Sequence, residues 1–151
     1  MTYLLDTCTI STLRKKGTSE GKKLREWASR MEDRFFFISV LTIGELQFGI
    51  SKLSEKEEKI KNALQSWLVG DLIPSFGNRI LTIDQQICSI WGDMTAQAAK
   101  KGVILPMGDA LIAATAIKHD LIVVTQNIKH FKSSGARLFD PLYEEEKTQR
   151  N

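Results

Sequence analysis

Three acidic residues lie far apart in this sequence of 151 residues, each near the point where an apolar run of strand length gives way to a helical pattern. Asp6 follows the opening apolar run, residues 3–5, and Glu45 comes shortly after a second run, residues 35–38. Asp109 opens an alanine-rich segment. Mg²⁺ and Mn²⁺ prefer oxygen ligands, and such a cation can lower the pKa of a bound water and offset charge on a phosphate. If the fold gathers the three acids, the chain carries a metal site suited to cutting phosphodiester bonds.

Each acid also has a purely structural explanation. Asp6 and Asp109 can cap the helices that follow them, because the free N–H groups and the dipole of a helix N-terminus favour a carboxylate. Glu45 can lie on the solvated face of an amphipathic helix. Position alone leaves both explanations open, and the metal site requires all three residues to meet at one edge of the fold.

The elements that must position these acids alternate along the chain. Short apolar runs are separated by longer helical patterns, which predicts an α/β domain with a parallel sheet of about five strands and helices on both faces. The predicted strands are Thr2–Leu5, Phe35–Ser39, Arg79–Ile83, Leu121–Thr125 and Arg137–Phe139. Ligands of such folds gather at the carboxyl ends of the strands, where the three acids map. We expect one domain over residues 1–140 and a polar, frayed tail over 141–151.

Polar residues mark the starts of two helices. Ser54 and Glu57 have the spacing of a capping box, which predicts a helix over Glu55–Leu68. Asp84 is the predicted N-cap of the following helix, and Gly102 is its stop signal.

The composition is that of an ordinary globular domain, with 42% hydrophobic and 26% charged residues. No apolar stretch reaches the roughly 18 residues that a membrane-spanning helix needs, so we expect a cytoplasmic protein without a membrane anchor. Cys8 and Cys88 lack CxxC spacing and are predicted to be buried, reduced thiols. The net charge of +3 permits nucleic-acid binding without arguing strongly for it.

Four blocks of the sequence resemble, in the same order, the motifs of PIN-domain ribonucleases of the VapC toxin type. The blocks are Tyr3–Thr7 with Ile10-Ser11, Ser39–Ile50, Leu105-Pro106 with Asp109–Thr115, and Val123–Phe131. In the second block the acid of the family falls on Glu45. Any one block is a weak signal, but all four together span almost the whole chain and make a strong match.

The resemblance implies a Rossmann-like PIN fold and Mg²⁺- or Mn²⁺-dependent cleavage of single-stranded or structured RNA, such as tRNA or rRNA loops, to arrest translation. It implies that Asp6, Glu45 and Asp109 hold the metal, directly or through water. Thr7 and Thr125 would support these carboxylates by hydrogen bonding. It also implies a homodimer and a small VapB-type antitoxin that neutralises the enzyme.

Two positions depart from the family's pattern. The fourth motif often supplies a further acid, whereas this chain has Asn127 and His130 there. Asn127 can ligate or position a water through its amide oxygen but brings no charge, so we expect a one-metal site. Cys8 stands where the family often has asparagine, and we interpret it as a packing residue. The three acids themselves are intact, which argues against an inactive relic.

RNA and an antitoxin would each need a surface near the acids. Phosphates bind basic side chains, and the candidates are Arg14, Lys15 and Lys16, in a loop after the first strand, and Lys129. For each of them the alternative is a merely solvated surface. An antitoxin helix could lie in an apolar groove formed by Phe48, Leu53, Trp67 and Leu68, although core packing is the expected role of at least half of these residues. An antitoxin arginine or lysine reaching the acids would replace the charge of the metal.

Three other functions compete with that of a ribonuclease toxin. A phosphoacceptor receiver domain has a similar size and layout, but it needs an adjacent acidic pair after the first strand, and Asp6 stands between Leu5 and Thr7. A non-catalytic RNA- or antitoxin-binding module would keep the fold without the chemistry. A housekeeping RNA-processing nuclease of the same fold would cut RNA without an antitoxin.

Overall fold

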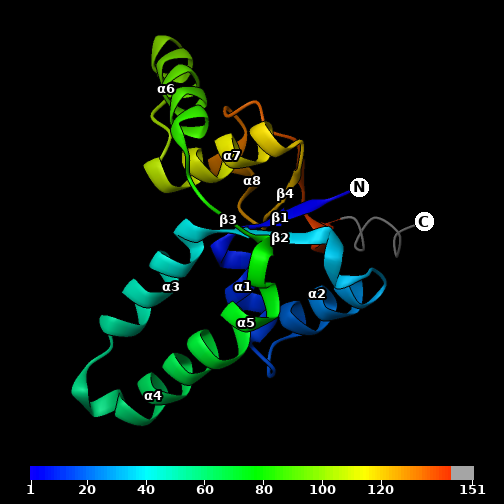
Figure 1. Cartoon of the computed structure of the whole chain (residues 1–151), viewed down its shortest axis with the longest axis vertical. Coiled ribbons are helices and arrows are strands. Elements are labelled where there is room, and N and C mark those ends of the chain that lie inside the picture. Colours follow the sequence, from blue (N-terminus) through cyan, green and yellow to red (C-terminus); the bar gives the residue numbers. More distant parts are fainter. Residues whose placement is uncertain (144–151) are drawn as a thin grey trace.

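The computed structural model describes residues 1–143, and a five-stranded sheet lies at its centre (Figure 1). Its strand order is β3-β2-β1-β4-β5, and neighbouring strands run parallel. The strands are β1 (Tyr3–Leu5), β2 (Phe36–Ser39), β3 (Ile80–Leu81), β4 (Ile122–Val124) and β5 (Leu138–Phe139). Each lies within a predicted range, so the prediction of a parallel α/β fold is confirmed.

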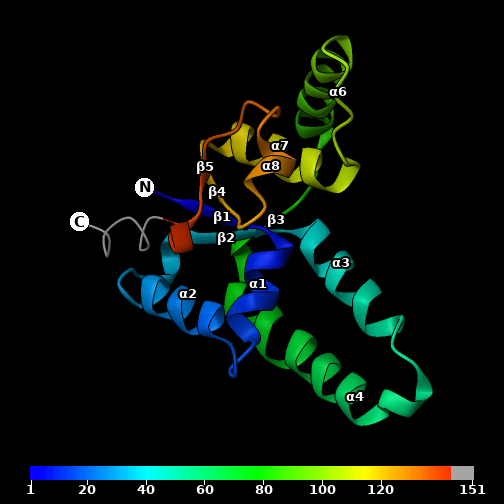
Figure 2. The same ribbon diagram turned by 180° about the vertical axis from the view of Figure 1, so that it is seen from behind.

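Helices cover both faces of the sheet. Figures 1 and 2 show α6, α7 and α8 on one side and α1, α2 and α5 on the other, while α3 and α4 form an arm that projects away. The helices are α1 (Thr7–Arg14), α2 (Ser19–Ser29), α3 (Val40–Ser51), α4 (Glu58–Trp67), α5 (Ile73–Phe76), α6 (Gln85–Lys100), α7 (Met107–His119) and α8 (Ile128–Phe131). Shorter turns are η1 (Asp33–Phe35), η2 (Glu55–Glu57), the π-helical η3 (Leu68–Leu72) and η4 (Gly77–Arg79).

The structure covers only part of the expected polar tail. Residues 141–143 form a helical turn after β5, and the rest of the expected tail, residues 144–151, lies outside the described residues.

None of the helices within residues 1–143 combines the length and the apolar character that crossing a bilayer requires.

Alternating side chains along the central strands build two cores, one on each face of the sheet. Leu4 and Val123 belong to the core that includes the buried alanines of α7. Tyr3 and Leu5 belong to the other core, together with Trp27 of α2. The rings of Tyr3 and Trp27 pack edge to face with their centroids 5.4 Å apart. Strand β1 therefore packs against a core on each face, and this packing fixes the position of Asp6, the residue after it.

One predicted helix start is wrong and another is confirmed. The capping box predicted a helix from Glu55, but residues 55–57 form η2, and α4 begins at Glu58 with Glu57 as its N-cap. The backbone N–H of Glu57 donates to the carbonyl of Ser54 at 3.0 Å, so the chain closes a tighter turn here before the α-helix starts. Asp84 is the N-cap of α6, as predicted, and its Oδ1 accepts a backbone hydrogen bond of 2.9 Å.

The prediction that both cysteines are buried is wrong. Within the described part of the chain, Cys8 and Cys88 are exposed free thiols. Their neighbours Thr9, Ile10 and Ile87 are the buried residues. Because successive residues of a helix point in different directions, an apolar neighbourhood in the sequence does not bury the residue in its middle.

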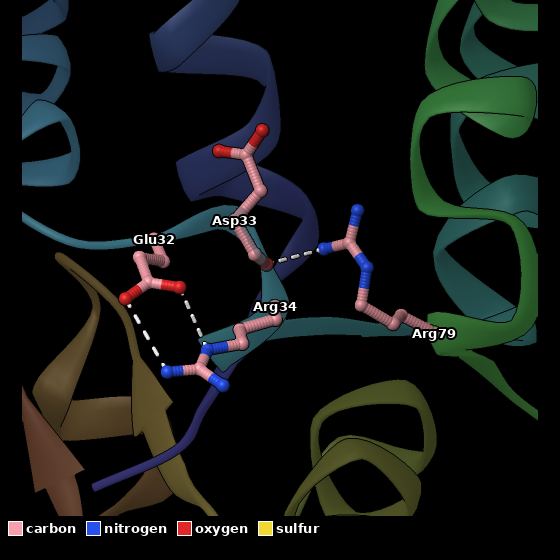
Figure 3. Close-up of polar contacts among 4 residues, drawn as sticks. All are labelled: Glu32, Asp33, Arg34 and Arg79. Atoms are coloured by element: carbon pink, nitrogen blue, oxygen red, sulfur yellow. Dashed lines mark hydrogen bonds and ion pairs between the residues drawn. The ribbon is translucent and has the colours of Figure 1, made fainter.

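Arg79 lies directly before β3 and contacts other segments of the chain, and Figure 3 shows its hydrogen bond with Asp33. Its Nη1 donates to the carbonyl oxygens of Asp33 at 2.6 Å and Phe36 at 2.7 Å, and its Nη2 donates to that of Ser75 at 2.6 Å. One guanidinium thus ties the segment leading into β2 to α5 and β3. Figure 3 also shows a separate ion pair nearby, between Arg34 and Glu32.

Gly21 permits the close contact between α1 and α2. A Cβ at this position would lie 2.3 Å from the carbonyl oxygen of Lys15 and 2.8 Å from that of Thr12, so the backbone of α1 would have to move. Gly21→Ala is expected to lower the free energy of unfolding by about 1–3 kcal/mol, the usual cost of overpacking, as measured by urea unfolding. Gly17→Ala is the matched control, since among the described residues a Cβ there has open space. An equal loss in both variants would contradict this steric explanation.

Candidate functional site

The three predicted acids come from three segments that reach the carboxyl-end edge of the sheet. Asp6 follows β1 and is the N-cap of α1. Glu45 lies in the middle of α3, the helix that follows β2, and Asp109 lies in the first turn of α7. Figure 2 shows α1 and α3 starting side by side from the sheet.

Contacts between these segments bring the acids toward one site. The hydroxyl of Thr7 donates to Oε1 of Glu45 at 2.7 Å and lies 3.0 Å from the hydroxyl of Thr42. The first turn of α7 lies beside the same glutamate, because a Cβ on Gly108 would be 3.5 Å from Oε2 of Glu45. The predicted support of a carboxylate by Thr7 therefore has Glu45 as its partner.

Asp6 is both a helix cap and a member of this site. Its side chain is buried, with the residue 3% exposed, and its Oδ1 accepts a 2.7 Å hydrogen bond from the backbone N–H of Thr9. Burial raises the pKa of Asp6 above its usual value, and the negative charge of Asp109 raises it further. Hydrogen bonds with Thr125 and Thr9 act in the opposite direction. The capping and the functional explanations are thus compatible at this position.

Asp109 has a different environment. The N-cap of α7 is Pro106, so Asp109 is a first-turn residue of this helix and not its cap. Burial raises the pKa of Asp109, while the neighbouring imidazole of His130 lowers it. Nδ1 of His130 lies 3.4 Å from Oδ2 of Asp109. His130 is one of the two fourth-motif residues, with Asn127, that stand where an additional acid was expected, and here it contacts one of the three acids.

Cys8 lies in the first turn of α1, directly after Thr7. The pKa of its thiol is raised first by partial burial and then by the negative charges of Asp6, Asp109 and, more weakly, Glu45. Sγ of Cys8 also accepts a 3.2 Å hydrogen bond from Nδ2 of Asn127. The interpretation of Cys8 as a packing residue is therefore wrong, because its side chain is exposed at the site and holds the amide of Asn127.

Thr125 and Asn127 complete the site from the end of β4. Thr125 is fully buried, and its Oγ1 accepts a 2.9 Å hydrogen bond from the backbone N–H of Asn127. Thr125 forms a hydrogen bond with Asp6, and Asn127 forms one with Cys8. These contacts hold the loop after β4 against the start of α1. Sequence reasoning missed Cys8 and His130 as contacts of the acids, although both stand where the chain departs from the family's pattern.

The predicted basic residues lie in two places. Arg14 is the last residue of α1 and not a loop residue, so the predicted loop holds only Lys15 and Lys16. Arg14 and Lys15 line a cavity of about 470 Å³ between α1, α3 and α4, which also has Thr7 and Glu45 in its wall. Lys129 lies away from this cavity, on α8. The structure therefore places Arg14 and Lys15 in one cavity wall with Glu45, but not Lys16.

The residues predicted to form an apolar groove lie in different places in the structure. Trp67 lines the cavity between α1, α3 and α4, and the guanidinium of Arg14 lies 5.6 Å from the centre of its ring. Phe48 is 67% exposed, whereas Leu68 is only 1% exposed and belongs to the core. Leu68 therefore has the core-packing role that was the alternative to the groove, and it lies in the π-helical turn η3.

The donor set suits a hard cation bound partly by water. Among residues 1–143 no group of three or more histidine, cysteine, aspartate or glutamate residues could hold a metal ion on its own. Mg²⁺ commonly takes only one or two carboxylates from a protein and completes its shell with water and substrate phosphate. Asp6 and Asp109 are carboxylates whose pKa is raised by burial, and a cation beside them would offset the repulsion that adds to the shift of Asp6.

Comparison with known proteins places this fold and site in a family. The PIN domain family matches residues 3–134. Ribonuclease VapC2 from Rickettsia felis is 32% identical over 135 residues, which cover 87% of this chain and 91% of the relative. Toxin FitB from Neisseria gonorrhoeae is 28% identical over 141 residues, covering 93% and 99%. The crystal structure of FitAcB from the same organism has a TM-score of 0.83 at 28% identity, covering 93% of this chain and 99% of that one.

The chain therefore belongs to the PIN domain family, in its VapC-type branch. The fold and the resemblance expected from the four sequence blocks are confirmed. A receiver domain, which would be a different family, is excluded.

Proposed function

We propose that this protein is the toxin of a toxin–antitoxin pair and acts as a Mg²⁺- or Mn²⁺-dependent endoribonuclease. The observation that carries the proposal is that Asp6, Glu45 and Asp109 come from distant segments that meet: Thr7, next to Asp6, donates to Glu45 at 2.7 Å, and a Cβ on Gly108, next to Asp109, would lie 3.5 Å from the same carboxylate. Such a concentration of negative charge has a cost unless a cation offsets it. The names of the relatives, a ribonuclease and a toxin, support the same activity.

Each residue of the site has a role that follows from its contacts. Asp6 and Asp109 would hold the cation through carboxylate oxygens, and Glu45 would do so directly or through water. A bound Mg²⁺ or Mn²⁺ supplies an activated water and a positive charge for the phosphate. Thr7 orients Glu45 through their 2.7 Å hydrogen bond, which places this carboxylate to accept a proton from the attacking water. Thr125 and His130 position Asp6 and Asp109, respectively.

The substrate would approach along the cavity between α1, α3 and α4. Arg14 and Lys15 lie in its wall with Glu45, so phosphates bound by the basic side chains lead toward the acids. Single-stranded or looped RNA is the expected substrate, because its backbone can bend toward the acids and its bases are not held in a duplex. Cleavage of tRNA or rRNA loops in the cytoplasm would arrest translation.

A VapB-type antitoxin is the partner that such a toxin requires. Its helix would pack on the arm formed by α3 and α4, where Phe48 is exposed and Trp67 lines the cavity. An antitoxin arginine or lysine would reach the acids and replace the charge of the metal. The toxin itself is expected to be a homodimer, which its mass in solution would test. A co-purified complex that kept full nuclease activity would overturn this mode of neutralisation.

The proposed activity is tested with the protein purified free of any partner. Incubated with RNA, it is expected to cut in Mg²⁺ or Mn²⁺ and to stop in EDTA, with activity returning when the metal is added back in excess. Cleavage that EDTA leaves unchanged would overturn the metal dependence. Absence of cleavage in every metal, with a folded protein and varied RNA substrates, would overturn the nuclease activity.

A further inference from the structure

A second cavity shares residues with the surroundings of the acids. It has a volume of about 620 Å³ and lies where α8 meets the edge strand β5. Its wall includes Gln126, Asn127, Ile128, Phe139 and Tyr143. This volume falls within the range of roughly 300–1,000 Å³ that is usual for sites that enclose small ligands or ligand groups.

Two residues belong both to this cavity and to the acid site. Asn127 lines the cavity and donates to Sγ of Cys8 at 3.2 Å. His130 lines the cavity and lies 3.4 Å from Oδ2 of Asp109. A phosphate bound at the acids would therefore have this cavity as the immediate neighbour for the nucleoside attached to it.

Aromatic residues and side-chain amides both line this cavity. Phe139 is held rigidly, because its ring packs against those of Tyr3 and Trp27 with centroids 6.4 and 5.7 Å away. Tyr143 is 55% exposed and supplies a second, outer ring. The amides of Gln126 and Asn127 add donors and acceptors at the edge. A nucleobase has the matching features, an aromatic face that stacks and an edge that forms hydrogen bonds.

We propose that this cavity binds one unpaired nucleobase of the RNA, adjacent to the phosphate on which the acids act. The inference rests on the proposed ribonuclease activity and adds a binding site for a base to it. Lys129, which is exposed on α8 at the same cavity, is placed to contact a phosphate on the far side of that base. The site selects unpaired bases, because a base stacked within a duplex cannot enter it.

The test measures binding without cleavage. A short, labelled single-stranded RNA is titrated with the protein in EDTA, and fluorescence anisotropy gives its Kd. Tyr143→Ala is expected to weaken binding by roughly tenfold, in the range reported for the loss of one base–aromatic stack. Tyr143→Phe keeps the ring and should stay within about twofold of the wild type. Ile60→Ala, which removes a side chain of similar exposure, 57%, on the projecting helix α4, is the control and should leave binding unchanged.

A set of RNAs with one abasic position each makes the test specific for a base. One position is expected to weaken binding of the wild type by the same factor as Tyr143→Ala and to have no further effect in that variant. If Tyr143→Ala binds as tightly as the wild type, or if the wild type does not bind the RNA, the proposal is overturned. Unchanged RNA binding is also the result expected if a protein segment occupies the cavity instead.

The same proteins separate this proposal from the one on which it rests. If the wild type fails to cut RNA in Mg²⁺ and Mn²⁺ but its binding depends on Tyr143 and on one base, the nuclease proposal fails and the base site stands. If the wild type cuts RNA and Tyr143→Ala binds and cuts equally well, the base site fails alone.

Discussion

Replacing Asp6 with asparagine is expected to remove RNA cleavage while it makes the folded protein more stable at neutral pH. The activity is expected to fall by at least about a hundredfold, the order of loss that follows removal of one group from a preorganised electrostatic site. Asparagine keeps the size of the side chain and an oxygen for the cap bond to Thr9, which is 2.7 Å long in the wild type. It loses the charge that would hold the cation.

The gain in stability follows from the burial of Asp6. Burial, and to a smaller extent the charge of Asp109, raises the pKa of this carboxyl in the folded protein. A raised pKa means that the charged form destabilises the fold, and this cost is fully present above the folded pKa. The cost disappears as the pH falls below the unfolded value of about 3.9. The difference in Tm between Asp6→Asn and the wild type should therefore be largest at neutral pH and shrink on acidification.

Two comparisons keep this prediction independent of folding defects. Asp6→Ala removes the charge and also the cap, so it should be less stable than Asp6→Asn, because asparagine is as good an N-cap as aspartate. Added Mg²⁺ or Mn²⁺ should raise the Tm of the wild type and have a smaller effect on either variant. Full cleavage by a stable Asp6→Asn protein would remove Asp6 from the catalytic set.

The fold could be predicted from the sequence because local patterns and the final structure agree along most of the chain. Apolar runs such as residues 3–5 and 122–124 are buried from both faces, as parallel strands between two helical layers must be. The capping-box prediction at Ser54 failed because the same spacing also fits a tight turn, and the backbone bond to Glu57 favours that turn. Sequence spacing cannot distinguish an α-helix that starts at Glu55 from a tight turn at that position. The outcome depends on how the chain connects α3 to α4, which is a tertiary property.

The candidate site was predictable only in part. Asp6, Glu45 and Asp109 could be proposed because acids near strand ends converge in such a fold. The contact of His130 with Asp109 depends on how the short helix α8 lies against α7, which is a tertiary property. Likewise, the exposure of Cys8 depends on the direction of one residue in the first turn of α1. These positions departed from the family's pattern, which marked them as unusual without showing what they touch.

A large effect on stability is expected from Arg79, whose guanidinium donates to three backbone carbonyls, two in residues 33–36 and one in α5. Hydrogen bonds to a charged group contribute about 1.5–3 kcal/mol, and losses that share one donor are not additive. Arg79→Ala is expected to lower the free energy of unfolding by about 1–3 kcal/mol, measured by urea unfolding, because only the bond to Phe36 is partly buried and the other two are exposed. Arg79→Lys keeps the positive charge but lacks the planar guanidinium with its several N–H donors. It should therefore recover only part of the lost free energy of unfolding.

Arg34 supplies the matched control, because it is an arginine of the same region with a different environment. It pairs with Glu32 at 2.8 Å, but both side chains are about 70% exposed, at 70% and 68%. Exposed ion pairs contribute about 0–1 kcal/mol, so Arg34→Ala should change the free energy of unfolding little. Since Arg79 anchors the entry to β2, which leads into the helix of Glu45, Arg79→Ala should also lose RNA cleavage near its unfolding midpoint. Equal stability losses in Arg79→Ala and Arg34→Ala would show that the three carbonyl contacts do not hold these segments together.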